Sequence, residues 1–470
     1  MIRLLTILLV IVFTGCEYQA AEQKSQPNIL WLIIEDFSPD LSCYGNTDLH
    51  TPNIDQIAQE GTLYTQAYTS APVCSPSRSA FMTGMYQTTI GAQHHRSHRG
   101  DGFTLPDTVK TAPEWFAQNG YFTANIKHGF DQFKGTGKKD LNFKHNKLFQ
   151  SNHWDSLKAN QPFYAQVNFA PVHRMMYKMP DTLLVDPDSV HLPPYYPDHP
   201  VARLDWAKYL TKAMLLDNMV GEVMQKLKQD GLQENTIVML FGDHGRNHIR
   251  GKQWLYDPGL HIPLIIKRPN QPAGIVDDIL VSGIDLLPTS LGLAGLDIPS
   301  AMQGINFLDA DPRNYIYAAR DRCDESAERV RAVRGKGYKY IRNYMPELPY
   351  MQPNKYKQAY YPMWMLMEKL AEENKLNADQ LKFLQSTKPI EELYDLIADP
   401  HELNNLASSP EHTAKLNEMR ELLDNWVIET KDQGQFPESD SVRAMWSQKI
   451  TEWDVTSQIE EIRNLIDSYE

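Results

Sequence analysis

Three apolar runs of strand length constrain the fold of this chain most strongly. They are PNILWLIIED (27–36), PFYAQVNFAPVH (162–173) and NTIVMLFGDHG (235–245), and each is a largely apolar run that stops at polar residues. Apolarity that is continuous rather than alternating is typical of strands buried on both faces, as in a parallel sheet. The runs therefore predict central strands of a sheet that helices cover on both sides.

Helices are expected between these runs. Residues 51–61 carry Thr51 as a cap and Pro52 at the first helical position, and further candidates lie at 111–120 and 204–231. Strands that alternate with helices imply a doubly wound α/β fold, in which ligands bind outside the carboxyl ends of the strands. Five polar residues fall at such ends: Glu35, Asp36, His173, Asp243 and His244.

The sequence changes in character towards its C-terminal end. Residues 329–343 predict a hairpin with a Gly-Lys-Gly turn, 391–407 a short strand and turn, and 412–431 a helix. We expect a smaller α+β domain with an antiparallel sheet over 326–470, after a catalytic α/β domain over 27–325. Within the smaller domain, the Pro-, Tyr- and Met-rich stretch 345–365 predicts a long surface loop.

The N-terminal residues predict export. Arg3 is followed by ten largely apolar residues, too few for a membrane span of about 20 but suited to a secretory signal peptide. Thr14-Gly15-Cys16 resembles a bacterial lipobox, which would make residues 1–16 a signal peptide, acylate Cys16 and leave 17–26 as a polar tether. We expect a bacterial lipoprotein in the periplasm or at the outer membrane or cell surface. A plain signal peptide is the alternative, because Phe13 is unusual in a lipobox.

Net charge and cysteine spacing exclude two classes of protein. The formal charge of −13 argues against general nucleic-acid binding, which favours a basic surface. The four cysteines, at positions 16, 43, 74 and 323, form no C-x-x-C pair and no zinc spacing, so the chain is not a disulfide scaffold.

Cys74 lies in the segment APVCSPSRSAFMTG (71–84). Taken alone it would be a buried thiol, since free cysteine is among the most buried residue types. However, CSPSR at 74–78 followed by TG at 83–84 resembles the signature of the type I, formylglycine-dependent sulfatases of the alkaline phosphatase superfamily. Further landmarks of that family occur in the expected order at 27–45, 241–245, 252–265 and 392–407. The likeness spans about residues 27–410.

The resemblance implies a fold and a nucleophile. The fold would be a large doubly wound mixed sheet sandwiched by helices, with a smaller C-terminal α+β domain. Cys74 would be oxidised to formylglycine by a formylglycine-generating or an anaerobic sulfatase-maturating enzyme. The hydrate of that aldehyde carries two hydroxyls, of which one attacks sulfur and the other allows sulfate to be expelled, an exit that a serine nucleophile lacks.

The resemblance also implies a metal centre. Its ligands would be Glu35, Asp36, the modified Cys74, Asp243 and His244, around one Ca²⁺ per chain, with Mg²⁺ the less favoured ion. The family usually has two aspartates where this chain has Glu35-Asp36, and an ordinary hydrogen-bonded histidine is the alternative for His244.

Four further residues would act on the sulfate by the same resemblance: Arg78, Lys127, His173 and Lys252. Arg78 would orient the nucleophile, while Lys252 and His173 would bind the sulfate and the leaving-group oxygen. Relatives carry G-K-x-H where this chain reads GYFTANIKHGF (120–130), so Lys127 is the counterpart of their lysine and the role of His128 is doubtful. A structural histidine is the alternative for His173.

Basic segments and one charged triplet are candidates for substrate binding. Residues 127–147 hold six lysines against two aspartates, and HHRSHRG (94–100) places His94 and His95 near the nucleophile, although a solvated loop is the alternative. Arg320, Asp321 and Arg322 could bind acidic groups of neighbouring sugars, or could form ion pairs between the domains.

The expected function is that of an exported sulfatase acting on sulfated carbohydrate, either an algal polysaccharide such as ulvan or a glycosaminoglycan. CSPSRSAFMTG and FAPVHR also resemble segments of heparan N-sulfatases, which keeps a sulfamate substrate open. Two competing classes are a phosphodiesterase or phosphonate monoester hydrolase of the same superfamily and a non-catalytic glycan-binding lipoprotein.

Overall fold

The computed structural model describes residues 26–97, 102–128, 133–174 and 182–469. The predicted signal peptide with Cys16, and all of the predicted tether except its last residue, lie outside the described residues.

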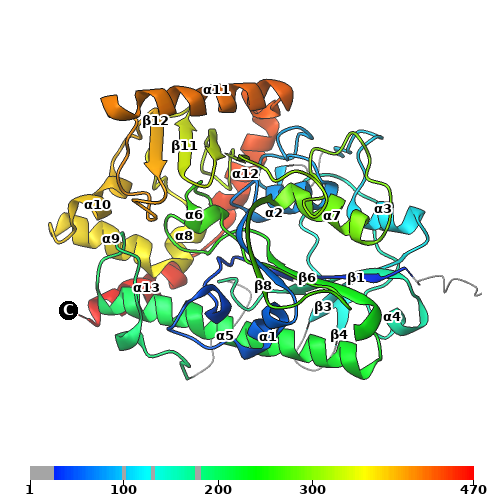
Figure 1. Cartoon of the computed structure of the whole chain (residues 1–470). Coiled ribbons are helices and arrows are strands. Elements are labelled where there is room, and N and C mark those ends of the chain that lie inside the picture. Colours follow the sequence, from blue (N-terminus) through cyan, green and yellow to red (C-terminus); the bar gives the residue numbers. More distant parts are fainter. Residues whose placement is uncertain (1–25, 98–101, 129–132, 175–181, 470) are drawn as a thin grey trace, which may run out of the picture.

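A mixed eight-stranded sheet forms the centre of the larger part of the chain (Figure 1). In spatial order its strands are β4 (Phe133–Thr136), β3 (Phe122–His128), β5 (Phe163–Phe169), β1 (Asn28–Ile34), β6 (Thr236–Gly242), β7 (Leu264–Lys267), β2 (Thr62–Tyr68) and β8 (Ile275–Ser282). Strand β1 pairs in parallel with both β5 and β6, whereas β4 and β7 run antiparallel to their neighbours. The three apolar runs are therefore the three central strands, as predicted.

Helices cover both faces of this sheet (Figure 1). Along β1, Leu30 and Leu32 pack in the core shared with α1 (Pro52–Gln59) and α5 (Pro200–Gln229). The alternate residues Ile29 and Trp31 pack in the core shared with α2 (Cys74–Thr83), α3 (Ala112–Gln118) and α7 (Leu286–Leu293). The short helices α4 (Ser156–Ala159) and α6 (Asp257–Leu260) lie in connections. Burial of both faces explains why β1 reads as one continuous apolar run.

A second, antiparallel sheet lies in the C-terminal region. Its order is β12 (Glu391–Asp395), β11 (Tyr338–Asn343), β10 (Val330–Arg334) and β9 (Ile316–Arg320), and α11 (Thr413–Glu429) packs on it through Leu416, Met419 and Trp426. The predicted fold class is confirmed, and β10 and β11 form the predicted hairpin. Strand β9 ends at Arg320, so the smaller sheet begins within the range expected for the catalytic domain, before residue 326.

The prediction of a long surface loop at 345–365 is wrong over its second half. Residues 355–372 form α8 (Lys355–Tyr360) and α9 (Pro362–Glu372), and Tyr361, Met363 and Trp364 are buried. The aromatic and Met side chains there pack against the main core instead of facing solvent. The remaining helices are α10 (Ala378–Leu381), α12 (Asp440–Glu452) and α13 (Thr456–Asp467).

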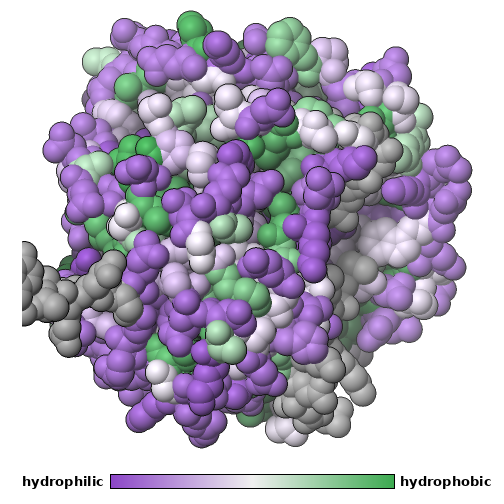
Figure 2. Space-filling model, turned by 90° about the vertical axis from the view of Figure 1, so that its right-hand side faces the viewer, coloured by the Kyte–Doolittle hydropathy of each residue, from purple (hydrophilic) through white to green (hydrophobic). Residues whose placement is uncertain are grey.

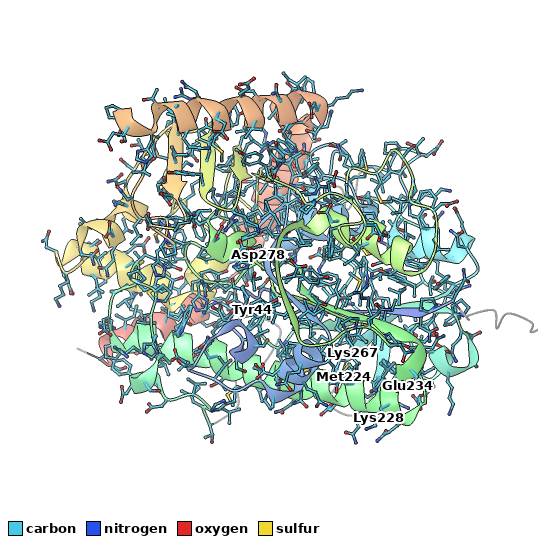
Figure 3. All side chains as sticks on the ribbon, in the orientation of Figure 1. Tyr44, Met224, Lys228, Glu234, Lys267 and Asp278 are labelled. Carbon is cyan, nitrogen blue, oxygen red and sulfur yellow. The ribbon has the colours of Figure 1, made fainter. Side chains whose placement is uncertain are left out.

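Polar residues cover most of one face of the molecule (Figure 2). The face shown in Figure 2 is largely hydrophilic, with small scattered hydrophobic patches. In the described part of the chain no helix combines the length and the apolar character needed to cross a membrane. Tyr44, labelled in Figure 3, has its hydroxyl 3.1 Å from the carbonyl oxygen of Leu264, which ties the loop after β1 to strand β7.

Candidate active site

The candidate active site lies at the carboxyl ends of β1 and β6, where α2 begins. Glu35 and Asp36 follow β1, Asp243 and His244 follow β6, and Cys74 is the first residue of α2. The φ angle of +55° at Asp36 turns the backbone sharply after the strand, a conformation that costs a non-glycine residue energy. At most 1% of the surface of each of these five residues is exposed.

The thiol of Cys74 points into a polar cluster. Its Sγ lies 3.2 Å from Nε2 of His244 and 3.8 Å from Oδ1 of Asp36. Burial acts to raise the pKa of Cys74, but the positive charges of Lys138, Lys252 and His244 outweigh burial and lower it to about 6. The start of a helix also favours negative charge at this position. An anionic group is therefore favoured at the position of Sγ.

Asp36 is the centre of the cluster. Nζ of Lys252 lies 2.8 and 3.0 Å from its two carboxylate oxygens, and Nε2 of His244 lies 3.0 Å from Oδ1. Nε2 of His173 approaches the other oxygen at 3.9 Å. Burial tends to raise the pKa of Asp36, yet Lys252 and the two histidines hold it well below its usual range. Asp36 is therefore a buried carboxylate with cations on several sides.

Arg78 joins the two strand ends from within α2. Its Nε donates to Oδ2 of Asp243 at 3.0 Å, and its Nη1 donates to Oδ1 of Asn168 at 2.8 Å. Nη2 is 3.7 Å from Glu35, a carboxylate that also accepts from Nζ of Lys138 at 2.9 Å. The planar guanidinium thereby fixes the carboxylates that follow β1 and β6 in one arrangement.

The residues at this site fit a divalent cation. Donor atoms of Asp36, Cys74 and His244 lie within 4.8 Å of one another, and Oδ1 of Asp243 is 3.7 Å from Nε2 of His244. Nδ1 of His244 lies 2.9 Å from the carbonyl oxygen of Gly245, which directs Nε2 towards the cluster. Buried carboxylates and an imidazole are a donor set for a metal ion. Glu35 is not part of this set, because its carboxylate contacts Lys138 and Arg78 instead.

The segment after α3 places its predicted residues differently. Lys127 is exposed near the end of β3, while His128 is buried with its Nε2 3.0 Å from Glu222 of α5. The lysine that reaches the cluster is Lys138, which follows β4. Sequence reasoning missed it because it belongs to a lysine-rich stretch that had a solvated loop as its alternative.

The loop with His94 and His95 borders the start of α2, because the backbone N–H of Arg96 donates to Oγ of Ser75 at 3.0 Å. His94 is partly buried. His95 is buried, with Nδ1 3.2 Å from Asp324 and 3.4 Å from Sγ of Cys323. His95 therefore faces Asp324 and Cys323, and the charged groups that act on His94 are Asp321, Glu438 and the nearby arginines.

The triplet Arg320–Arg322 is engaged in ion pairs within the chain. Nε of Arg322 donates to Glu438 at 2.5 Å and Nη2 donates to the same carboxylate at 2.9 Å. Asp321 accepts from Arg331, and Nη1 of Arg320 lies 3.7 Å from Glu328. All three side chains are buried, so the structure shows the ion-pair arrangement rather than side chains open to a ligand.

Three polar side chains near the cluster were not anticipated. Nδ2 of Asn247 is 3.5 Å from Asp36, and Asn168 accepts a hydrogen bond from Arg78. The centre of the Tyr356 ring lies 5.4 Å from Nζ of Lys252. Asn168 stands inside the apolar run of β5, where a polar residue on a buried strand was the available signal. No such signal pointed to Tyr356, because it belongs to α8, which lies in the stretch that was expected to be a loop.

Comparison with known proteins identifies the family. A family model described as Sulfatase matches residues 27–296, and one described as N-sulphoglucosamine sulphohydrolase, C-terminal, matches residues 242–352. An ulvan-active sulfatase of Formosa agariphila is 34% identical over 92% of this chain and 80% of its own length. The chain belongs to the sulfatase family, and it is an enzyme that hydrolyses sulfate esters.

Two further similarities mark the range of chemistry among similar proteins. Human N-sulphoglucosamine sulphohydrolase is 27% identical over 86% of this chain and 90% of its own. The solved structure of a phosphonate monoester hydrolase from Silicibacter pomeroyi superposes with a TM-score of 0.61 at 18% identity, covering 87% of this chain and 96% of its own. That structural likeness shows the fold alone.

Proposed function

We propose that this sulfatase removes sulfate ester groups from a sulfated carbohydrate, with formylglycine formed from Cys74 as the nucleophile. The observation that carries the proposal is the placement of Cys74 at the start of α2, buried and 3.2 Å from His244. Oxidation by a maturating enzyme would put an aldehyde hydrate there. One of its hydroxyls would attack sulfur, and loss of the proton from the other would release sulfate and restore the aldehyde.

The surrounding side chains have separate tasks in this proposal. Lys252 and His173, both beside Asp36, are positioned to bind the sulfate and the departing sugar oxygen. Burial lowers the pKa of His173 to about 3, so Lys252 is the group that would give a proton to that oxygen. Arg78 fixes the position of Asp243, a carboxylate of the same cluster as Cys74, by a hydrogen bond. Lys138, rather than Lys127, supplies the second lysine, since its charge acts on Cys74 from the Glu35 side.

The metal in this proposal is one Ca²⁺ per chain. Asp36, Asp243 and His244 would hold it together with the modified Cys74, and Glu35 is a further carboxylate at its edge. A bound divalent cation supplies positive charge that activates a hydroxyl and neutralises sulfate. Ca²⁺ suits an irregular oxygen-rich shell better than Mg²⁺ does.

Metal analysis of the purified protein tests the ion. We expect one Ca²⁺ per chain, and less in Asp243→Ala. Zinc as the sole metal, with activity insensitive to calcium chelation, would contradict the assignment.

Two substrate classes are supported by specific similarities. The ulvan-active relative favours an O-sulfated polysaccharide such as ulvan, and a glycosaminoglycan is the related choice. The similarity to N-sulphoglucosamine sulphohydrolase favours a sulfamate as the second candidate. The only support for a phosphate or phosphonate ester as substrate is the shared fold.

A panel of substrates discriminates these classes. Defined O-sulfated oligosaccharides, an N-sulfated glucosamine and a phosphonate monoester would be compared under identical conditions. We expect the highest kcat/KM for an O-sulfated sugar. A higher value for the sulfamate would move the assignment to the second candidate, and preference for the phosphonate would overturn both.

Location and organisation complete the proposal. We place the mature protein outside the cytoplasm, anchored through acylated Cys16 in the periplasm or at the cell surface. Its catalytic domain would comprise residues 27–315, and its smaller domain would begin with β9, ten residues before the boundary expected from the sequence. Globomycin-sensitive processing of the precursor, with palmitate incorporation that is lost in Cys16→Ser, is the expected result; processing without acylation would indicate a plain signal peptide.

A further inference from the structure

We propose that a pocket between the two sheets, distinct from the cluster around Cys74, is a second binding site for a sulfated polysaccharide chain. The inference rests on the proposed function for its choice of ligand. The pocket has a volume of about 540 Å³, within the range of small-ligand sites. None of the 12 residues that line it belongs to the catalytic cluster.

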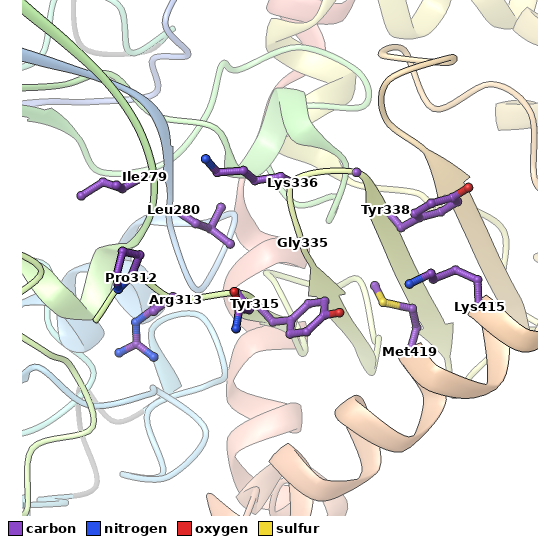
Figure 4. A pocket seen from close by; sticks show the side chains of 12 residues that line it. Ile279, Leu280, Pro312, Arg313, Tyr315, Gly335, Lys336, Tyr338, Lys415 and Met419 are labelled. Atoms are coloured by element: carbon purple, nitrogen blue, oxygen red, sulfur yellow. The ribbon is translucent and has the colours of Figure 1, made fainter. Parts of the chain in front are cut away.

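The pocket is built from elements of both sheets. In Figure 4, Ile279 and Leu280 of β8 lie on one side, and Tyr338 of β11 and Met419 of α11 lie on the other. Tyr315 lies between them, just before β9. The walls therefore offer apolar surface and aromatic rings that carry hydroxyls, which suits the faces and edges of sugar rings.

The charge of the lining has one sign. Its three charged residues, Arg313, Lys336 and Lys415, are all cations, in a chain whose formal charge is −13. Each cation pairs with a carboxylate, Asp285, Asp278 or Glu418, but none of these carboxylates lines the pocket, so the lining itself presents cationic groups to an anionic ligand. A continuous nucleic-acid backbone is disfavoured by that overall charge, whereas one sulfated sugar needs only these few cations.

The two lysines can be released for a ligand. Lys336 pairs with Asp278 at 2.8 Å, and Lys415 pairs with Glu418 at 2.5 Å. The Lys336 and Asp278 side chains are 53% and 75% exposed, and exposed pairs of this kind contribute only about 0–1 kcal/mol. A sulfate group can therefore compete for the ammonium groups. Arg313, by contrast, is held by Asp285.

The turn between β10 and β11 packs closely against Tyr315 of the pocket. A Cβ on Gly335 would lie 3.0 Å from Cε1 of Tyr315, tighter than ordinary contact. Glycine thus lets the turn lie against the tyrosine ring and leaves Lys336 at the rim. The ammonium of Lys415 lies 5.5 Å from the centre of the Tyr338 ring, so charge and ring surface occur together.

A polymeric substrate gives such a site a purpose. The cluster around Cys74 is almost fully buried and takes one sulfated unit, so the rest of a polymer must lie on outer surfaces. A second site would hold the enzyme on the polymer between cleavage events and raise the local substrate concentration.

The test is binding of the full-length chain to ulvan and to heparin, measured by affinity electrophoresis in a Cys74→Ala background that prevents turnover. The variant reverses two charges, Lys336→Glu with Lys415→Glu. The matched control is Lys375→Glu with Lys382→Glu, which also reverses two exposed, ion-paired lysines. Tyr338→Ala removes the ring without changing charge.

We expect the pocket double variant to weaken binding to the favoured polymer about tenfold, as two exposed charge contacts would, and the control to leave it unchanged. Tyr338→Ala should also weaken binding, and the desulfated polymer should not bind. With Cys74 restored, turnover of a small sulfated substrate should be the same in every variant. Equal binding by the pocket and control variants, binding that survives desulfation, or no binding to either polymer would overturn the proposal. Failure of the proposed function would appear separately, as absent turnover in all proteins with the binding difference intact.

Discussion

Two regions of this chain bury many charges, and they use them differently. Around Asp36, three basic side chains converge on one carboxylate beside the Cys74 thiol. In the second region, which we call the seam, each arginine is held by carboxylates: Arg331 by Asp321 and Asp432, and Arg322 by Glu438. Both regions are almost inaccessible to solvent.

The difference teaches how to separate a reactive site from a structural one. In the seam each guanidinium faces carboxylates at hydrogen-bond distance, so the pairing is complete. At the active site the positive charges of Lys138, Lys252 and His244 outweigh burial and lower the pKa of Cys74 to about 6, so an anion is favoured at the position of Sγ. The pKa of the equally buried Cys323 is raised instead, because burial and Asp324 disfavour its thiolate. Burial of charge alone therefore does not indicate chemistry.

The largest effect on the active-site side of the comparison should come from Cys74→Ala. Loss of the nucleophile should lower kcat/KM for sulfate ester hydrolysis by at least about 10⁴-fold, with little change in Tm. Cys43→Ala is the control, since Cys43 is a free thiol away from the cluster. Near-native turnover by Cys74→Ala, measured as sulfate release, would sink the assignment of the nucleophile.

Lys252→Ala should come next. It removes the cation that contacts both oxygens of Asp36, and we expect kcat to fall by about 10²–10³-fold, as for loss of a group that stabilises developing charge. Lys388→Ala is a matched control, because Lys388 is also buried and pairs with Glu328 in the C-terminal region. The control should lower Tm without changing kcat. The same kinetic loss in both variants would mean that Lys252 is structural.

Arg331→Ala, in the seam, should lower the stability of the protein and leave catalysis unchanged. It leaves Asp321 and Asp432 buried without their partner, which should cost about 3–5 kcal/mol of the free energy of unfolding. Denaturant titration measures the loss, and Asp432→Asn provides a milder variant. In the folded fraction kcat/KM should be unchanged. A kinetic loss with normal stability would place the seam within the active site.

The smallest effect should be that of Arg322→Ala. Its guanidinium is bound by Glu438 and by the carbonyl oxygens of His95 and Asp324. We expect stability to fall by about 1–3 kcal/mol and kcat/KM to change equally for an aryl sulfate and for a sulfated oligosaccharide. A loss of kcat/KM confined to the oligosaccharide would indicate instead that this arginine binds the sugar chain.

The parts of the site that sequence could predict are local in the chain. Asp36, Asp243 and His244 stand directly after apolar strands, and the carboxyl ends of adjacent parallel strands must meet. Cys74 and Arg78 are one helical turn apart, so a single short motif placed both on α2. The central strands were predictable because burial on both faces leaves an apolar run.

The parts that sequence could not predict depend on long-range packing. Lys138 reaches Glu35 from 103 positions away, and Arg322 meets Glu438 from 116 positions away. Such pairings leave no pattern in either segment. Tyr356 and the helices around it were missed for a related reason, since aromatic residues beside Pro are ambiguous until a neighbouring surface exists to bury them.

The measurement that tests the central claim most directly is the mass of the Cys74 peptide, taken with activity on the same preparations. The chain would be produced with and without a formylglycine-generating enzyme. We predict a peptide in which the thiol sulfur is replaced by aldehyde oxygen, in a fraction proportional to specific activity, and no activity where only thiol is found. Full activity in a preparation whose peptide carries only the unmodified thiol would contradict the account.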